Sequence, residues 1–256
     1  MDPATLIGIG AGFVAIFGSM IMEGGQPGAL FLIPPIILVF GGTIGAAMAG
    51  SLMRDVKRLP KALMRAIKAN PVVAHDSVEV IVSLADRARR EGLLALESEI
   101  TLVEDPFLRR ALEMAVDGTD ADEVSEILFA EVDAKRANDA VESKIFSDMG
   151  GYSPTIGIIG TVIGLVHVLG SLQDTSALGG KIASAFVATL WGVMSANLIF
   201  FPLGNRLKRV SEAECEAMEL AIEGVLAIQA GSNPRLIAQK LQSMLPQSEP
   251  PQKEVA

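Results

Sequence analysis

The sequence predicts an all-α integral membrane protein with four transmembrane helices and a helical cytoplasmic domain. Its 256 residues include 21 Lys and Arg and 30 Asp and Glu, but four stretches contain none of these: residues 3–22, 24–53, 149–173 and 182–205. Each stretch reaches the roughly 18–20 residues that cross about 30 Å of hydrocarbon as a helix. Elsewhere apolar residues recur at helical spacing, and no run predicts a β-strand.

This segregation of charge excludes several classes of protein. A soluble α/β enzyme would spread its charges more evenly, and the composition excludes collagenous, disulfide-rich and fully disordered chains. The single Cys215 excludes a disulfide scaffold. The net charge of −9 argues against nucleic acid as a partner. A signal peptide would begin with a basic n-region, but Asp2 is the only charged residue before the first stretch, and no small-x-small cleavage site follows it. We therefore expect a retained helix and not a signal peptide.

The Lys and Arg residues near the spans predict the orientation. Among Lys and Arg residues, the loops 23–28 and 172–181 contain only Lys181, whereas six cations follow the second stretch. These are Arg54, Lys57, Arg58, Lys61, Arg65 and Lys68. By the positive-inside rule, both termini and residues 51–150 are cytoplasmic. We therefore expect transmembrane helices 1 and 2 in 1–50, a cytoplasmic insert in 51–150, helices 3 and 4 in 151–205, and cytoplasmic C-terminal helices with a disordered tail in 206–256.

The insert begins with an amphipathic pattern over residues 51–68. Its apolar positions are Leu52, Val56, Leu59, Leu63 and Ile67. Either this helix lies along the inner membrane surface, or it packs on other protein. Further helices are expected over 76–90, from Pro106, and from Thr119 or Asp120 to about Asp148, with breaks at Gly92 and Gly118. Residues 206–229 extend span 4 as a helix, and a last short helix ends near Leu245.

Spans 3 and 4 contain small residues at helical spacing, which let helix backbones approach closely in lipid. They are Gly157, Gly160 and Gly164 in span 3, and Ser184, Ala188, Gly192 and Ala196 in span 4. The pattern fits packing within one chain as well as a contact between subunits.

No carboxylate or fixed cation lies inside any span. A chain that moves ions alone usually has an intramembrane ionisable group, so if this chain conducts a cation, we expect another chain to supply the titrating carboxylate. The polar candidates are Thr161, His167, Ser184, Thr189, Ser195 and Asn197. Thr161 and Thr189 lie near the middle of their spans, where each could line an ion path or bond its own i−4 carbonyl. Pro154 and Pro202 lie at the inner ends of spans 3 and 4. Each could be a point where the helix bends or simply a helix boundary.

Several runs of residues resemble one known family. These are Gly41-Gly42-Thr43; the segment Ala88–Glu97, ARREGLLALE; the segment Ser153–Leu165, SPTIGIIGTVIGL; the segment Ala188–Asn197, ATLWGVMSAN; and Phe200-Phe201-Pro202. With four spans, short outer loops and an insert of about 100 residues, the chain resembles the MotA/PomA flagellar stator proteins of the MotA/TolQ/ExbB proton channel family. The resemblance extends from residue 1 to about 245.

This resemblance implies a flagellar stator subunit in the bacterial inner membrane. Such chains form a homo-oligomeric ring, expected to be a pentamer, around a MotB/PomB-like single-span partner that carries the ion-binding aspartate. Ion flow turns the ring against the rotor protein FliG. No enzymatic reaction and no cofactor are expected besides the transported H+ or Na+, with protons slightly favoured. Membrane lipids are the other expected partner.

The resemblance also implies roles for single residues. Thr189 matches a threonine on the ion path, and Thr161 a second one in sodium-type stators. Pro154 and Pro202 match prolines that couple ion flow to movement. Arg89, Arg90 and Glu97 match the rotor contacts, although the residues taken alone favour a solvated helix end with local ion pairs.

Other functions compete with this interpretation. A TolQ/ExbB-type energiser of outer-membrane processes shares the ring and the last two spans, but those relatives have three spans and another topology. A small-molecule permease would show an internal repeat, which the sequence lacks. A passive scaffold would not need hydroxyls and prolines at matching depths. The four charge-free stretches favour the stator.

Overall fold

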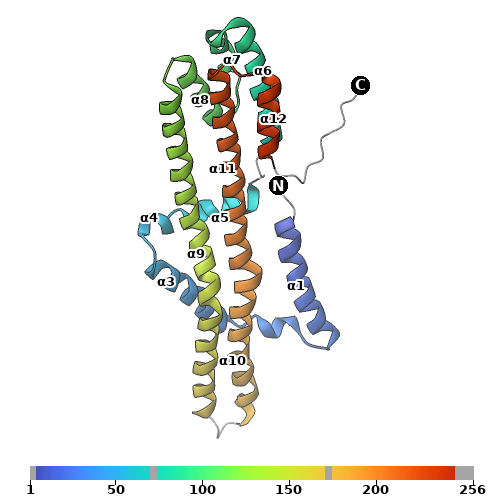
Figure 1. Cartoon of the computed structure of the whole chain (residues 1–256). Helices are drawn as coiled ribbons and strands as arrows, with labels where there is room; N and C mark the ends of the chain where they lie inside the picture. The colour runs from blue at the N-terminus through green and yellow to red at the C-terminus, as the bar shows by residue number, and fades with distance from the viewer. Residues whose placement is uncertain (1–3, 70–73, 171–174, 246–256) are drawn as a thin grey trace. The chain divides into compact units, whose positions relative to one another are not determined.

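The computed structural model describes residues 4–69, 74–170 and 175–245, and these ranges are helical with no strand (Figure 1). The α-helices are α1 (Ala4–Met22), α2 (Ile33–Ile36), α3 (Gly42–Ala49), α4 (Met53–Val56), α5 (Leu59–Lys68), α6 (Ala74–Glu91), α7 (Glu97–Ile100), α8 (Pro106–Val116), α9 (Ala121–Leu169), α10 (Thr175–Ser195), α11 (Phe201–Gln229) and α12 (Pro234–Met244). Two 3₁₀ turns, η1 (Pro27–Leu30) and η3 (Leu93–Leu96), and two π-helical turns, η2 (Ile37–Gly41) and η4 (Ala196–Phe200), join them. The predicted all-α class is confirmed.

The chain divides into two compact units. Unit 1 comprises residues 1–70 and 138–210, and unit 2 comprises residues 71–137 and 211–256. Helices α9 and α11 contribute residues to both units. The four segments expected from membrane topology describe a different property, namely the side of the membrane, and they stay a prediction.

Three helical stretches of the described chain are long and apolar enough to cross a membrane. They lie in α1, in α9 and in the continuous run Leu178–Gln229. The second charge-free stretch gives only a shorter apolar helix, Ile33–Ala49. Its 17 residues extend about 26 Å at 1.5 Å per residue. Because η1 with Pro27 occupies the start of that stretch, its 30 uncharged residues do not form one helix, and the expected count of four full spans is not confirmed.

The helix expected from Thr119 or Asp120 is longer than the sequence suggested. The Asp120 carboxylate accepts a hydrogen bond from the Asp122 N–H at 2.9 Å, so Asp120 caps α9. The helix then continues past Asp148 and through Pro154 to Leu169, uniting the last helix of the insert with span 3. In the same way, span 4 continues through η4 into α11 as far as Gln229, as predicted.

Unit 1 has two apolar clusters beside its long helices. Trp191 of α10 packs against Phe31 and Phe40, and its indole N–H donates to the Leu30 carbonyl at 2.7 Å. In the second cluster, Ala62 and Ala66 of α5 are buried with residues of α3, α9, η4 and α11. Helix α5 therefore packs on protein through its alanines.

The apolar stripe expected over residues 51–68 is only partly buried, since Leu59 packs against this cluster while other members of the stripe face outward. Leu52 and Leu63 are exposed, as is Met64, because the smaller Ala62 and Ala66 allow a closer approach to α9 and α11. The exposed apolar side chains remain available for a lipid contact.

Unit 2 has its own core, formed by α6, η3, α7, α8, the start of α9, α11 and α12. Ile81, Leu112, Leu128 and Ile222 are among its fully buried side chains. The predicted breaks at Gly92 and Gly118 are confirmed as turns with positive φ. At φ +91°, Gly92 adopts a conformation that side chains disfavour, and it separates α6 from η3. The proposed tail, residues 246–256, lies outside the described residues.

Candidate functional site

The candidate ion-path residues meet within unit 1. The hydroxyls of Thr161 on α9 and Thr189 on α10 are hydrogen-bonded to each other. Thr161 Oγ1 also lies 3.1 Å from the Ala185 carbonyl oxygen, and both hydroxyls lie 3.3 Å from that of Gly157. Both threonines are half-buried. The simple alternative, a threonine bonded only to its own i−4 carbonyl, therefore fails for both.

This arrangement has spare acceptor capacity. Each hydroxyl carries one proton and two lone pairs, so the two hydroxyls cannot donate to all of these oxygens at once. The Gly157 and Ala185 carbonyls accept without donating. The pair can therefore accept a hydrogen bond from a protonated carboxylic acid or contribute oxygens to a dehydrated cation, without placing a fixed charge in the membrane.

Small residues make this contact between α9 and α10 possible. We call it the glycine seam, and it consists of Gly157, Gly160, Gly164, Ala185, Ala188 and Gly192. A Cβ added at Gly157 would lie 2.9 Å from the Ala188 carbonyl oxygen, and one added at Gly192 would lie 2.7 Å from that of Ser153. The small residues therefore serve packing within one chain, one of the two alternatives that the sequence left open.

The seam has no ionisable partner of its own. Within the described parts of 149–173 and 182–205 no Asp, Glu, Lys or Arg occurs. The described residues also hold no cluster of His, Cys, Asp and Glu that fits a metal ion. The hydroxyl pair of Thr161 and Thr189 can therefore hydrogen-bond a titrating carboxylate, but the described parts of these two stretches contain none.

A second hydroxyl pair joins the helices near Pro154. Ser153 Oγ and Ser195 Oγ are 2.6 Å apart, and both residues are fully buried. Ser195 Oγ also lies 2.6 Å from the Trp191 carbonyl oxygen. We call this pair the serine brace. Sequence reasoning noted Ser195 but missed Ser153, for which the signal was a hydroxyl beside a proline at a span end.

The two candidate coupling prolines have different surroundings. Pro154 lies inside the unbroken helix α9, directly after the serine brace residue Ser153, and its Cα would lie 3.3 Å from a Cβ added at Gly192. Pro202 follows the π-helical turn η4. A proline lacks the N–H and crowds the carbonyl four residues earlier, and a wider turn relieves both effects. Pro202 is thus more than a helix boundary, because α11 continues beyond it.

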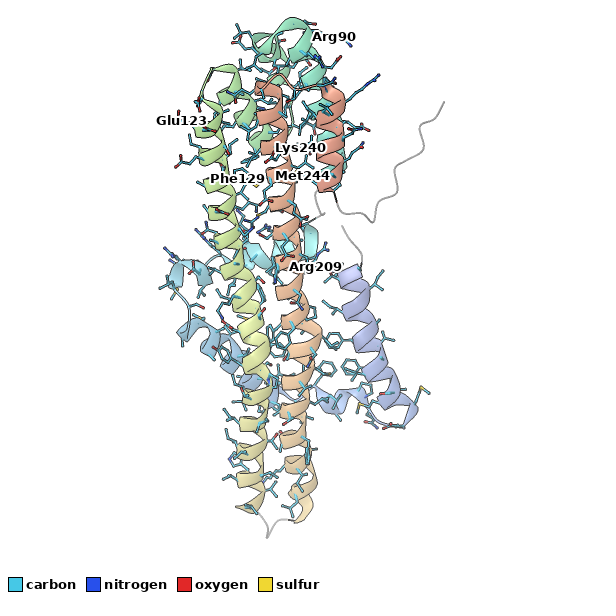
Figure 2. All side chains as sticks on the ribbon, viewed as in Figure 1. Arg90, Glu123, Phe129, Arg209, Lys240 and Met244 are labelled. Carbon is cyan, nitrogen blue, oxygen red and sulfur yellow. The ribbon has the colours of Figure 1, made fainter. Side chains whose placement is uncertain are left out.

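The candidate rotor contacts lie in unit 2. Arg89 and Arg90 end α6 and Glu97 begins α7, and all three are exposed. We call these three residues the charged tip (Figure 2 labels Arg90). Arg90 forms an ion pair with Asp86 at 2.7 Å, whereas Arg89 and Glu97 form no ion pair with the described residues. The ion pairs that hold this region belong to Arg87, which bonds Glu91 and Glu99.

A charged cluster joins α5 to α9 in unit 1, outside the charge-free stretches. Arg65 makes a two-pronged bond to the Asp139 carboxylate at 2.8 and 2.7 Å, and it lies 3.8 Å from Glu142. Burial and the neighbouring Asp139 raise the pKa of Glu142 above its usual 4.5, while Arg65 opposes this shift.

Comparisons with known proteins agree with this architecture. Residues 99–220 match the MotA/TolQ/ExbB proton channel family, and residues 6–92 match the family described as Motility protein A N-terminal. Motility protein A of Borreliella burgdorferi is 36% identical over 245 residues, which cover 96% of this chain and 94% of that protein.

Two solved structures have the same fold. The structure of C. jejuni MotAB matches with a TM-score of 0.94 at 29% identity, covering 99% of this chain and 100% of that one. The flagellar MotAB stator complex from Bacillus subtilis matches with a TM-score of 0.88 at 38% identity, covering 94% and 95%. With these similarities over almost its full length, the chain belongs to the MotA/TolQ/ExbB proton channel family.

Proposed function

We propose that this chain is the ring-forming subunit of a flagellar motor stator, which converts ion flow across the inner membrane into torque. The similarity to Motility protein A and to MotAB stator structures supports this role. Helices long and apolar enough to cross a membrane support a place in the inner membrane. The cations that follow span 2 support cytoplasmic termini and a cytoplasmic insert.

The observation that carries this proposal is the hydroxyl pair of Thr161 and Thr189 in a contact without charge. A single-span MotB-like partner supplies the titrating carboxylate. When that acid is protonated, it donates a hydrogen bond to the pair, and when it is ionised, the hydroxyls can donate to it instead. The pair therefore fits both states of a carboxylate that loads and releases an ion.

The remaining residues couple ion movement to rotation. Pro154 and Pro202 interrupt the hydrogen-bond ladders of the helices that carry the two threonines, so these helices bend there with less resistance. The charged tip contacts FliG, because exposed charges steer repeated encounters without locking the partner in place. We further propose a pentameric ring, with protons slightly favoured as the coupling ion.

Thr189→Val tests the ion path. Valine keeps the size of threonine but removes the hydroxyl, so the co-expressed complex should assemble normally while its ion flux falls roughly tenfold or more. This estimate takes a hydrogen bond to a charged group as about 1.5–3 kcal/mol. Flux is measured by pH- or sodium-sensitive dye in proteoliposomes.

Thr155→Val is the matched control. Thr155 is an exposed threonine of the same α9 helix, bonded at 2.7 Å to the Tyr152 carbonyl and not to the pair. The complex that carries Thr155→Val should conduct like the unmodified complex. Normal flux in Thr189→Val would remove the hydroxyl pair from the path.

A TolQ/ExbB-type energiser is the alternative function. The match of residues 6–92 to the Motility protein A N-terminal family favours the stator, since it covers the first two apolar helices. Deleting the gene in a host without a second stator should leave assembled flagella that do not rotate. Normal swimming with a defective outer membrane would support the alternative.

A further inference from the structure

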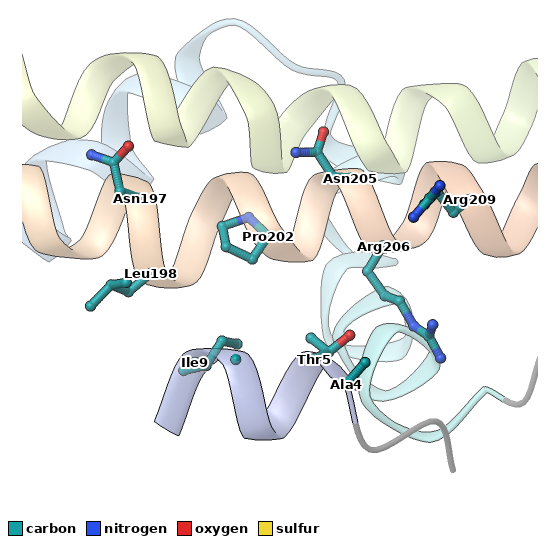
Figure 3. Close-up of a pocket in the computed structure, with 10 residues that line it drawn as sticks. Ala4, Thr5, Ile9, Asn197, Leu198, Pro202, Asn205, Arg206 and Arg209 are labelled. Carbon is teal, nitrogen blue, oxygen red and sulfur yellow. The ribbon is translucent and has the colours of Figure 1, made fainter. Parts of the chain in front are cut away.

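A groove of about 370 Å³ lies in unit 1 between the first turns of α1 and the passage from η4 into α11 (Figure 3). It contains neither threonine of the hydroxyl pair and no residue of the serine brace. Helix α1 runs antiparallel to this passage, so Ala4 and Thr5 lie beside Arg206, and Ile9 lies beside Leu198 (Figure 3). The groove therefore has two chemically different ends.

One end of the groove is cationic. Arg206 and Arg209 line it together with Asn205, and no Asp or Glu contributes to the lining. Arg206 Nη2 donates to the Ala69 carbonyl at 3.0 Å, which holds this side chain in place. Arg209 is exposed and makes no ion pair or hydrogen bond with the described residues. This end is complementary to an anion with several oxygen acceptors, such as a phosphate.

The other end is mainly apolar, and Asn197, the polar residue that also lines it, donates to the Val193 carbonyl at 2.9 Å. Ile9 and Leu198 form its walls, and a Cβ added at Gly8 would have no atom within 4 Å. No residue of α1 is buried, so this face of the helix has no protein cover in the single chain. The open space beside Gly8 is suited to a hydrocarbon chain.

The position of the groove relative to the charge-free stretch identifies its surroundings. Uncharged residues of span 4 end at Asn205, and Arg206 begins the basic cytoplasmic flank. The cationic end therefore lies at headgroup level on the cytoplasmic side, and the apolar end points toward the hydrocarbon.

We propose that this groove binds one anionic phospholipid of the cytoplasmic leaflet. Its phosphate contacts Arg209 and Arg206, and one acyl chain lies along Gly8, Ile9 and Leu198. Because Pro202 also lines the groove, the lipid contacts the proline after the π-helical turn. The inference requires only a place in the membrane, so its failure would leave the stator role intact.

Lipid titration of the purified complex with its single-span partner tests the headgroup contact. Phosphatidylglycerol is added in detergent and bound lipid is counted by native mass spectrometry. Arg209→Gln should raise the concentration for half-saturation about fivefold, the effect of one cation near an anionic membrane surface. Arg58→Gln, an equal charge change on the basic segment after span 2, should leave that concentration unchanged.

Two further arms distinguish the ligand. Phosphatidylcholine should bind more weakly than phosphatidylglycerol, and inorganic phosphate should not compete at equal concentration. Equal titration curves for Arg209→Gln and the unmodified complex would overturn the proposal, as would full competition by inorganic phosphate, which would indicate a free-anion site.

Filling the apolar end is an independent test. Gly8→Leu places a side chain in the groove, and Gly10→Leu places the same side chain on α1 outside the lining, where a Cβ also has open space. Gly8→Leu should abolish the tightly bound lipid, and Gly10→Leu should retain it. Loss of complex assembly in Gly8→Leu alone would show that another protein segment or a second copy fills the groove, and would overturn the proposal.

Discussion

A methyl group added at Gly157 in the glycine seam would lie 2.9 Å from a carbonyl oxygen, whereas Arg89 in the charged tip has no ion-pair partner among the described residues. The glycine seam and the serine brace together hold α9 and α10 by close backbone contact and buried hydroxyls. The tip presents charges that contribute little to the fold of its unit. Changes at the seam therefore alter stability and ion flow together, while changes at the tip separate function from stability.

Gly157→Ala should have the largest effect on stability. The added methyl group meets the Ala188 carbonyl oxygen and backbone atoms of Thr189 and Gly192, so the helices must separate, at a cost of about 1–3 kcal/mol. The thermal midpoint of the purified complex measures this.

Gly151→Ala is the control, in the same helix with nothing within 4 Å of its added Cβ. It should leave the midpoint unchanged or raise it, because alanine favours a helix by up to about 1 kcal/mol. If both variants behaved alike, close packing would not be what holds the seam.

Replacing either serine of the serine brace should lower the stability by an intermediate amount, and the two replacements should differ in cost. Ser195→Ala removes the one described partner of the buried Ser153 hydroxyl, at a cost of about 1–3 kcal/mol. Ser153→Ala leaves Ser195 bonded to the Trp191 carbonyl and should cost less. A double-mutant cycle on the unfolding free energy measures the difference, and equal costs would contradict the assigned bonds.

Glu142→Gln should have a smaller effect whose size depends on pH. The raised pKa means that the folded protein binds a proton more tightly than the unfolded chain, so the stability contributed by Glu142 is present below pH 4.5 and lost as pH rises through the folded-state pKa. Glutamine stays neutral, so the variant should gain stability relative to the unmodified protein over that window. A constant difference between their thermal midpoints from acid to neutral pH would refute the assignment.

Arg90→Glu should affect stability least. It replaces an exposed ion pair with Asp86 by a repulsion, which changes stability by less than about 1 kcal/mol. Torque from tethered-cell rotation should nevertheless fall strongly, if the charged tip contacts the rotor. Arg235→Glu, the same charge reversal at an exposed position of α12 in unit 2, should retain torque. Reduced assembly of Arg90→Glu would make its role structural.

The sequence predicted the positions of the helices better than it predicted the contacts between them. Three of the four charge-free stretches and the breaks at Gly92 and Gly118 predicted the elements correctly, because hydropathy and backbone preference are local properties. The stretch 24–53 did not, because η1 with Pro27 interrupts it. The meeting of Thr161 with Thr189 was not predictable from depth alone, since depth does not fix how each helix is rotated. The buried face of α5 was also missed, because apolar spacing favoured Leu63 over the small Ala62 and Ala66.

The most direct test of the central claim compares ion flux through the chain with and without its single-span partner. We propose that Thr161 and Thr189 provide the hydroxyls while a companion helix provides the titrating acid. In proteoliposomes, the chain alone should pass neither protons nor sodium, and the complex should conduct unless the partner's carboxylate is replaced by an amide. Full conduction by the chain alone would contradict the account.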